Sequence, residues 1–238
     1  MLRALLFTLI PVAAAAVAGI IAAVTRPTER ITSAVQHFAA GVVFAAAAIE
    51  LLPRVLHQAP SVAIGGFAAG IAVMFGMRAI TDRLERRPSA GPTRRLPLGF
   101  AGATAVDFAI DGVILGAGFA AGATTGLLLT IALTIEYLFV GLSLSATLGP
   151  QAPRRLVIAA PVSLSLLTVA GTALGVWLLS GASATTLAGV LAFGAVAFMY
   201  LATEELLVEA HQRGETAAGS VTFFVGFLLY MVLTETLG

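Results

Sequence analysis

Long apolar stretches alternate with short polar ones along the whole chain. Each apolar stretch is at least as long as the roughly 20 residues that a helix needs to cross a bilayer. Their length and their alanine, leucine and glycine content favour helices over barrel strands, which run about ten residues with alternating polarity. The pattern therefore predicts an all-α polytopic membrane protein with eight transmembrane helices. We place these helices at about Leu2–Val24, Ile31–Leu52, Pro60–Ile80, Leu98–Ala121, Thr124–Leu148, Leu156–Leu179, Ala182–Leu207 and Ala218–Leu237.

The composition is that of a membrane domain, since 59% of the 238 residues are hydrophobic and only 11% are charged. A soluble domain carries about 25% charged residues, so this chain lacks the polar groups to cover a water-exposed surface. The eight spans predict a single transmembrane domain over residues 1–238. A net charge of +1 gives no electrostatic footprint for nucleic acid, and the lack of cysteine excludes disulfides and thiolate ligands. A cleaved signal peptide is an alternative for the first stretch, although that run is longer than a usual signal core.

The basic residues are unevenly distributed between the two sides of the predicted bundle. The chain has no lysine, and eleven of its thirteen arginines fall by the loops after the first, third, fifth and seventh spans. Only Arg3 and Arg54 fall on the other side. The positive-inside rule then predicts that both termini lie outside the cytoplasm of the cell (inner) membrane. The predicted loop at about residues 81–97 would be cytoplasmic.

Two pairs of segments repeat each other within the chain. Residues 38–52 and 193–207 share a Phe…Glu-Leu-Leu pattern at a constant offset of 155, and residues 107–115 resemble residues 136–144 at an offset of 29. The members of each pair lie an odd number of spans apart, so they cross the membrane in opposite directions. Such inverted repeats are typical of secondary transporters, whose substrate sites lie near the midplane. Shared composition of apolar helices is the alternative explanation.

Three acidic residues lie near the middle of the fourth and fifth predicted helices. Asp107 and Asp111 are four residues apart and therefore share one helical face, and Glu136 lies at the same depth in the next helix. Ionised carboxylates in hydrocarbon cost several kcal/mol each, so these acids must hold protons or bind a cation. Three carboxylates from two helices suit a divalent metal ion. Protonated acids that only help the helices pack are the alternative.

Further polar residues near the predicted helix ends are candidates for an entry or exit relay. They are Glu50 on the outer side, Glu204 and Glu205 on the inner side, and His211 beyond them. Ordinary interfacial acids are the alternative. For His37, His57 and His211, all placed near helix ends, an interfacial role is the favoured interpretation. The chain has no phosphate-binding loop, so nothing in it suggests that ATP drives a process.

On the basis of these residues, the chain resembles the ZIP (Zrt/Irt-like) family of divalent metal transporters. Asp107–Gly112 is similar to the helix 4 motif His-Asn-x-x-Asp/Glu-Gly of that family, and Glu136–Gly141 to its helix 5 motif His/Gln-Asp/Glu-x-Pro-Glu-Gly. His37–Pro53 and Thr203–His211 are similar to the second and seventh helices, the latter carrying a metal-binding acid near the inner gate. The resemblance extends over nearly the whole chain and implies eight helices in a 3+2+3 inverted-repeat bundle.

The chain departs from the family pattern at several site positions. The residues that differ are Asp107 for histidine, Phe108 for asparagine, Ile110 and Phe139 for the prolines, Tyr137 for an acid and Val140 for a bridging glutamate. A second metal site is therefore expected to be lost, which leaves one oxygen-rich site of Asp107, Asp111 and Glu136.

The resemblance implies a transporter, not an enzyme, that carries a divalent metal ion (zinc, manganese, iron, cobalt or cadmium) toward the cytoplasm and holds no prosthetic group. One alternative is a ZIP-fold protein that has lost divalent-metal transport and moves another cation or regulates a partner. An intramembrane aspartate enzyme is disfavoured, because Asp107 and Asp111 share one helix and no Gly-x-Gly-Asp element occurs. The sequence leaves open whether two copies form a homodimer.

Overall fold

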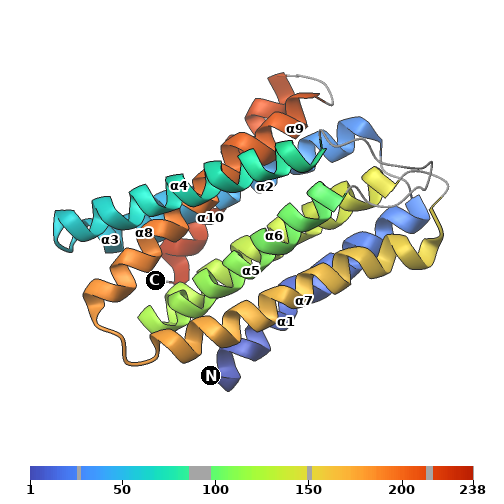
Figure 1. Ribbon diagram of the computed structural model, residues 1–238. Coiled ribbons are helices and arrows are strands. Elements are labelled where there is room, and N and C mark those ends of the chain that lie inside the picture. Colours follow the sequence, from blue (N-terminus) through green and yellow to red (C-terminus); the bar gives the residue numbers. More distant parts are fainter. Residues whose placement is uncertain (26–27, 86–97, 149–151, 213–216, 238) are drawn as a thin grey trace.

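The structure is a computed structural model that describes residues 1–25, 28–85, 98–148, 152–212 and 217–237. Figure 1 shows a bundle of long helices, and the described residues contain no strand. In chain order the elements are α1 (Leu2–Thr25), α2 (Glu29–Ala45), η1 (Ala46–Leu51), α3 (Leu52–Leu56), α4 (Pro60–Glu85), α5 (Leu98–Ala121), α6 (Ala123–Leu148), α7 (Arg154–Leu179), α8 (Ala184–Tyr200), η2 (Leu201–Leu206), α9 (Leu207–Gln212) and α10 (Ala217–Leu237).

Within the described residues, eight helical spans are long and apolar enough to cross a membrane, as the sequence predicts. Two of them are composite: α2, η1 and α3 form the second span, and α8, η2 and α9 form the seventh. Large apolar side chains point outward, among them Ile64, Trp177 and Phe224, each more than two-thirds exposed. An outer surface of this kind is compatible with lipid and not with water. The chain is thus a multi-pass membrane protein.

Several predicted helix boundaries differ from the structure. The second span begins at Glu29, behind the N-cap Thr28, and continues past Leu52 to Leu56. Pro53 does not end it, because this proline lies in the first turn of α3, where its missing N–H group is least costly. The seventh span begins later, at Ala184, and runs on to Gln212 instead of ending at 207.

The third span is also longer than predicted, because α4 continues from residue 80 to Glu85. Arg83, Leu84 and Glu85 in this extension are good helix formers, so the helix can project beyond the apolar region. The predicted loop at about 81–97 is therefore shorter. Its residues 86–97 lie outside the described residues.

Each composite span contains a six-residue π-helix, a wider turn in which the N–H group bonds five residues back. Leu52 N–H donates to the Ala47 carbonyl, and Leu207 N–H donates to the Ala202 carbonyl. These positions differ by 155, the offset of the sequence repeat. The preceding 17-residue helices α2 and α8, and their N-caps Thr28 and Ser183, keep the same offset.

The two composite spans pack against each other in opposite directions. The beginning of the second span, α2, contacts η2 and α9, while the beginning of the seventh, α8, contacts η1 and α3. Beside them, α5 and α6 pair through the middle of the bundle, and α1 and α7 lie on their other side (Figure 1). Glycines allow α5 and α7 to approach closely, since a Cβ atom added at Gly112 would lie 2.8 Å from the Gly171 Cα atom. This packing places the middle of α5 and α6 inside the protein.

Candidate metal site

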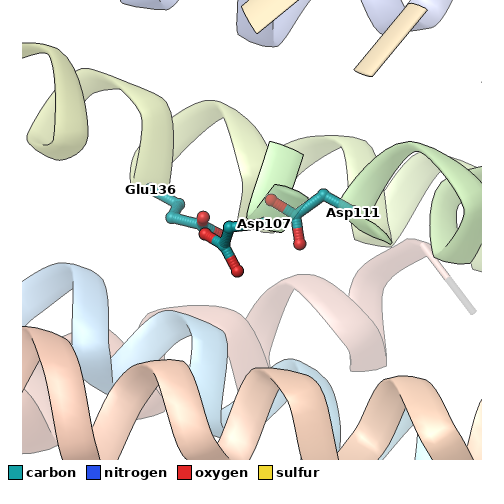
Figure 2. A group of neighbouring side chains, drawn as sticks. All are labelled: Asp107, Asp111 and Glu136. Atoms are coloured by element: carbon teal, nitrogen blue, oxygen red, sulfur yellow. The ribbon is translucent and has the colours of Figure 1, made fainter. Parts of the chain in front are cut away.

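The three central carboxylates meet between α5 and α6. Asp107 and Asp111 project from α5 and Glu136 from α6, and one carboxylate oxygen of each lies within 4.8 Å of the others. Figure 2 shows the three side chains pointing into the same space. Asp111 and Glu136 are buried, with 1% and 0% exposure, and Asp107 is half-buried. The structure thus brings together the residues that the helical spacing placed at one depth.

The spacing of these oxygens suits a metal ion of ordinary size. An ion at about 2.1 Å from each oxygen holds its ligands roughly 3–4 Å apart, so small side-chain rotations would bring the three into contact with it. Both oxygens of Glu136 are buried, and its carboxyl group lies beside that of Asp111. Two ionised carboxylates buried side by side are costly, and a shared proton or a bound cation removes that cost.

Asp111 is tied into a short hydrogen-bond chain that crosses three helices. The Tyr137 hydroxyl on α6 donates to Asp111 Oδ2 at 3.2 Å, and the same hydroxyl lies 2.5 Å from Thr168 Oγ1 on α7. The Tyr137 ring packs on Phe108, with ring centres 4.2 Å apart. Phe108 and Tyr137, two departures from the family motifs, are therefore neighbours that fill space together.

Sequence reasoning missed Tyr137 and Thr168 as partners of the site. Tyr137 follows Glu136 directly in the middle of an apolar helix, and a buried tyrosine hydroxyl usually finds a hydrogen-bond partner, so the sequence did indicate a polar contact for Tyr137 near the site. The sequence gave no such indication for Thr168, because a threonine in an apolar helix usually bonds its own backbone. The sixth span therefore contributes this hydroxyl to the surroundings of the site.

Of the relay candidates, Glu205 is an exposed residue that lies near the carboxylate cluster. It interacts electrostatically with Asp107, Asp111 and Glu136. Glu204 instead pairs with Arg78 of α4 at 2.5 Å, and Glu50 pairs with Arg54 at 2.9 Å. Among the described residues, neither of these ion pairs involves the three central acids. Glu204 and Glu205 are not at a helix end, because α9 continues the span beyond them.

The histidines are placed differently from the expectation. His37 lies eight residues after the start of the second span and is 2% exposed, so it is buried in the protein and not an exposed interfacial residue. His211 is near the end of α9 and exposed, and its ring packs edge-on against His37 with the ring centres 5.2 Å apart. His57 follows α3 and is exposed. Two of the three histidines, from helices far apart in the sequence, therefore form a pair.

Comparison with known proteins finds no family model and no curated protein that matches the chain. What the site does must therefore be inferred from its own residues.

Proposed function

We propose that this chain is a divergent member of the ZIP family that carries a divalent transition metal ion across the cell membrane toward the cytoplasm. The supporting observation is the central cluster, in which Asp107, Asp111 and Glu136 converge with one oxygen of each within 4.8 Å of the others. Such a cluster is expensive for helix packing alone, and an ion pathway is the usual reason for buried acids in a membrane. Glu205 continues the acidic path from this cluster along the seventh span.

The proposed architecture is the 3+2+3 inverted repeat of that family. Its support is that the helix contacts occur in matching pairs. The α5 helix packs along α7 as α6 packs along α1, and α10 packs along α2 as α4 packs along α8. The two π-helices at an offset of 155 belong to the same pattern. Alternating access would then move one group of helices against the other around the carboxylate site.

The proposed orientation puts both termini outside the cytoplasm. The arginines support it, because eleven of thirteen lie toward the loops of one side. Under this orientation the ends of η2 and α9 face the cytoplasm, and the ends of η1 and α3 face outward. The ion would pass from the carboxylate cluster past Glu205 on its way in.

A single site of oxygen ligands is proposed in place of a two-metal centre. Phe108 and Tyr137 pack on each other where the family pattern has an asparagine and an acid. Three carboxylates without histidine form a hard site, so manganese, iron(II) and cobalt should compete with zinc better than at a histidine-bearing site. Changing Asp107→His should move the uptake ratio toward zinc. An unchanged ratio of zinc to manganese uptake would show that Asp107 does not contact the ion.

Uptake of zinc and manganese into proteoliposomes tests the proposal. Glu136→Gln keeps the shape of the side chain but removes a charge, so it should reduce uptake at least about tenfold, the cost of about 1.4 kcal/mol in binding. Glu235→Gln, at the exposed end of α10, is the matched control and should leave uptake unchanged. Uptake at the wild-type rate in Glu136→Gln would contradict a transport role for the cluster.

Proton release gives a second readout on the same site. Acids without a cation hold protons, and a binding metal must displace them, so metal affinity should rise with pH. Glu136→Gln should release fewer protons per metal bound in weakly buffered solution. Unchanged affinity together with unchanged proton release would assign these acids a purely structural role.

The second candidate is a ZIP-fold protein that binds a cation but no longer transports divalent metals. The hydrogen bond from Tyr137 to Asp111 favours it, because it holds one of the three carboxylates to α6 and α7. The same experiments separate the two proposals. Metal binding and proton release in detergent, without uptake into proteoliposomes, would favour this second candidate.

A further inference from the structure

The His37–His211 pair is a feature that the carboxylate site does not use. His37 belongs to α2 and His211 to α9, and the two helices are in contact. The Ser33 hydroxyl joins them, because it donates to the Ala210 carbonyl at 3.1 Å. This hydrogen bond holds α2 and α9 together beside the two rings. The pair lies toward the end of the bundle where the second span begins and the seventh ends.

Both imidazole rings are held in the same tautomer. His37 Nδ1 lies 2.8 Å from the Ser33 carbonyl oxygen, and His211 Nδ1 lies 2.5 Å from the Leu207 carbonyl oxygen. A carbonyl oxygen can only accept a hydrogen bond, so Nδ1 carries the proton in both neutral rings. Each Nε2 atom is then the unprotonated nitrogen, on the ring edge away from its own helix. Histidines that bind metals are oriented in this way, with the second nitrogen donating to a carbonyl or carboxylate.

The spacing of the rings also fits a shared ion. An ion about 2.1 Å from each Nε2 in a tetrahedral arrangement separates the two ring centres by about 5 Å. The observed separation is 5.2 Å, with the ring planes at 64°. The α10 helix approaches the His37 ring through Gly219, where an added Cβ atom would lie 2.9 Å from Cε1, 3.0 Å from Nε2 and 3.1 Å from Nδ1. Only a residue without a side chain leaves the ring this room.

The geometry points to a second metal site, in which the Nε2 atoms of His37 and His211 bind a transition metal ion of the nitrogen-preferring class, such as zinc, copper(II) or nickel. Water completes the coordination on the exposed His211 side. The site differs in chemistry from the oxygen ligands of the carboxylate cluster, so it selects against hard ions such as manganese and magnesium. The role of this site as a binding site for transported metal near the cytoplasmic side rests on the proposed function. Its ability to bind metal does not.

Copper(II) bound to the purified full-length protein tests the site, because electron spin echo modulation detects the remote nitrogens of coordinated imidazoles. The experiment uses the Asp111→Asn, Glu136→Gln background, so that the carboxylate cluster does not compete. We expect a two-imidazole signal there. The His57→Ala variant is the matched control, since His57 is the third histidine of the chain and lies beyond α3. It should keep the full signal.

The His211→Ala variant should lose one imidazole, and competition with zinc should show at least about a tenfold loss of affinity, since even changes to groups behind a ligand cost that much. His211 is exposed, so this variant is expected to fold. His37→Gln keeps a donor for the Ser33 carbonyl and should have the same effect. Size-exclusion profiles of both variants matched to wild type exclude misfolding as the cause.

Three results would overturn the inference: no two-imidazole signal, a signal lost in His57→Ala, or a signal unchanged in His211→Ala and His37→Gln. Each would leave the two rings as edge-to-face packing only. Failure of the transport proposal looks different. In that case wild-type proteoliposomes take up no metal, while the two-imidazole signal of His37 and His211 remains.

Discussion

The two π-helices η1 and η2 have the same backbone form but differ in charge. In η1, Glu50 is followed four residues later by Arg54, and the two form an ion pair at 2.9 Å. In η2, Glu205 is followed four residues later by Glu209, an acid at the position that corresponds to Arg54. The two acids interact with each other. The second span is therefore close to neutral at its π-helix, while the seventh is negative and continuous with the carboxylate cluster.

This difference shows that the wide turn itself does not depend on the local charge or on proline. Pro53 follows η1, but Val208 stands at the corresponding place after η2, and both π-helices have the same length. In each span the π-helix packs against the other composite span, η1 against α8 and η2 against α2. The two segments therefore share backbone form and packing and differ in charge.

The orientation of the two π-helices gives the largest expected effect. Under the proposed topology, the end of η1 faces outward and the end of η2 faces the cytoplasm. The chain has no cysteine, so Ser61→Cys after the η1 end and Gln212→Cys at the α9 end can each be probed alone. An impermeant thiol reagent on intact cells should label Ser61→Cys fully and Gln212→Cys only after lysis. The reverse labelling would invert the proposed direction of transport.

The fold was largely predictable, because eight apolar runs of spanning length leave few alternatives. The π-helices were not. Their sequences differ, with small residues before Glu50 and larger ones before Glu204, and no local pattern marks a π-helix. The repeat at an offset of 155 was visible in sequence, but only the structure shows that it includes this wide turn. The second span continues past Leu52 because Pro53 lies in the first turn of α3, where proline is tolerated.

The site was predictable where it follows helix geometry and not where it depends on contacts between distant spans. Asp107, Asp111 and Glu136 could be placed at one depth from their positions in two adjacent helices. The residues of the Tyr137–Thr168 contact are 31 positions apart in the sequence, and those of the His37–His211 pair are 174 positions apart. Helix periodicity gives the face on which a side chain lies, but not which distant helix covers that face.

Removing one acid from each π-helix should have the next largest effect. Glu205→Gln should lower metal uptake about tenfold, or about 1.4 kcal/mol, because Glu205 interacts with all three central acids. Glu50→Gln should change uptake less than about twofold, since it loses only a partly exposed ion pair, which contributes at most about 1 kcal/mol. Initial uptake rates in proteoliposomes measure both. Equal losses would remove the functional difference between the two segments.

Making η2 resemble η1 should have an intermediate effect. Glu209→Arg would place an arginine four residues after Glu205, as Arg54 follows Glu50, and should lower uptake about threefold by neutralising the acidic path. The effect should shrink at high salt, because the site is near the surface. Glu209 accepts a hydrogen bond from Ser143, so Ser143→Ala is the matched control for loss of that contact. A drop of the same size in Ser143→Ala would assign the effect to the contact and not to charge.

Arg78 allows the smallest and most specific test, because its expected effect has the opposite sign. It pairs with Glu204 at 2.5 Å and also interacts with Glu205, so it partly offsets the negative charge of η2. The two paired side chains are 48% and 39% exposed, so losing the pair should cost at most about 1 kcal/mol of stability. Arg78→Gln should therefore leave the protein folded and raise cation uptake, by less than about twofold. Arg83→Gln, an exposed arginine further along α4, should change neither quantity. A fall in uptake in Arg78→Gln would mean that the arginine holds η2 in position, and that geometry, more than charge, distinguishes the two π-helices.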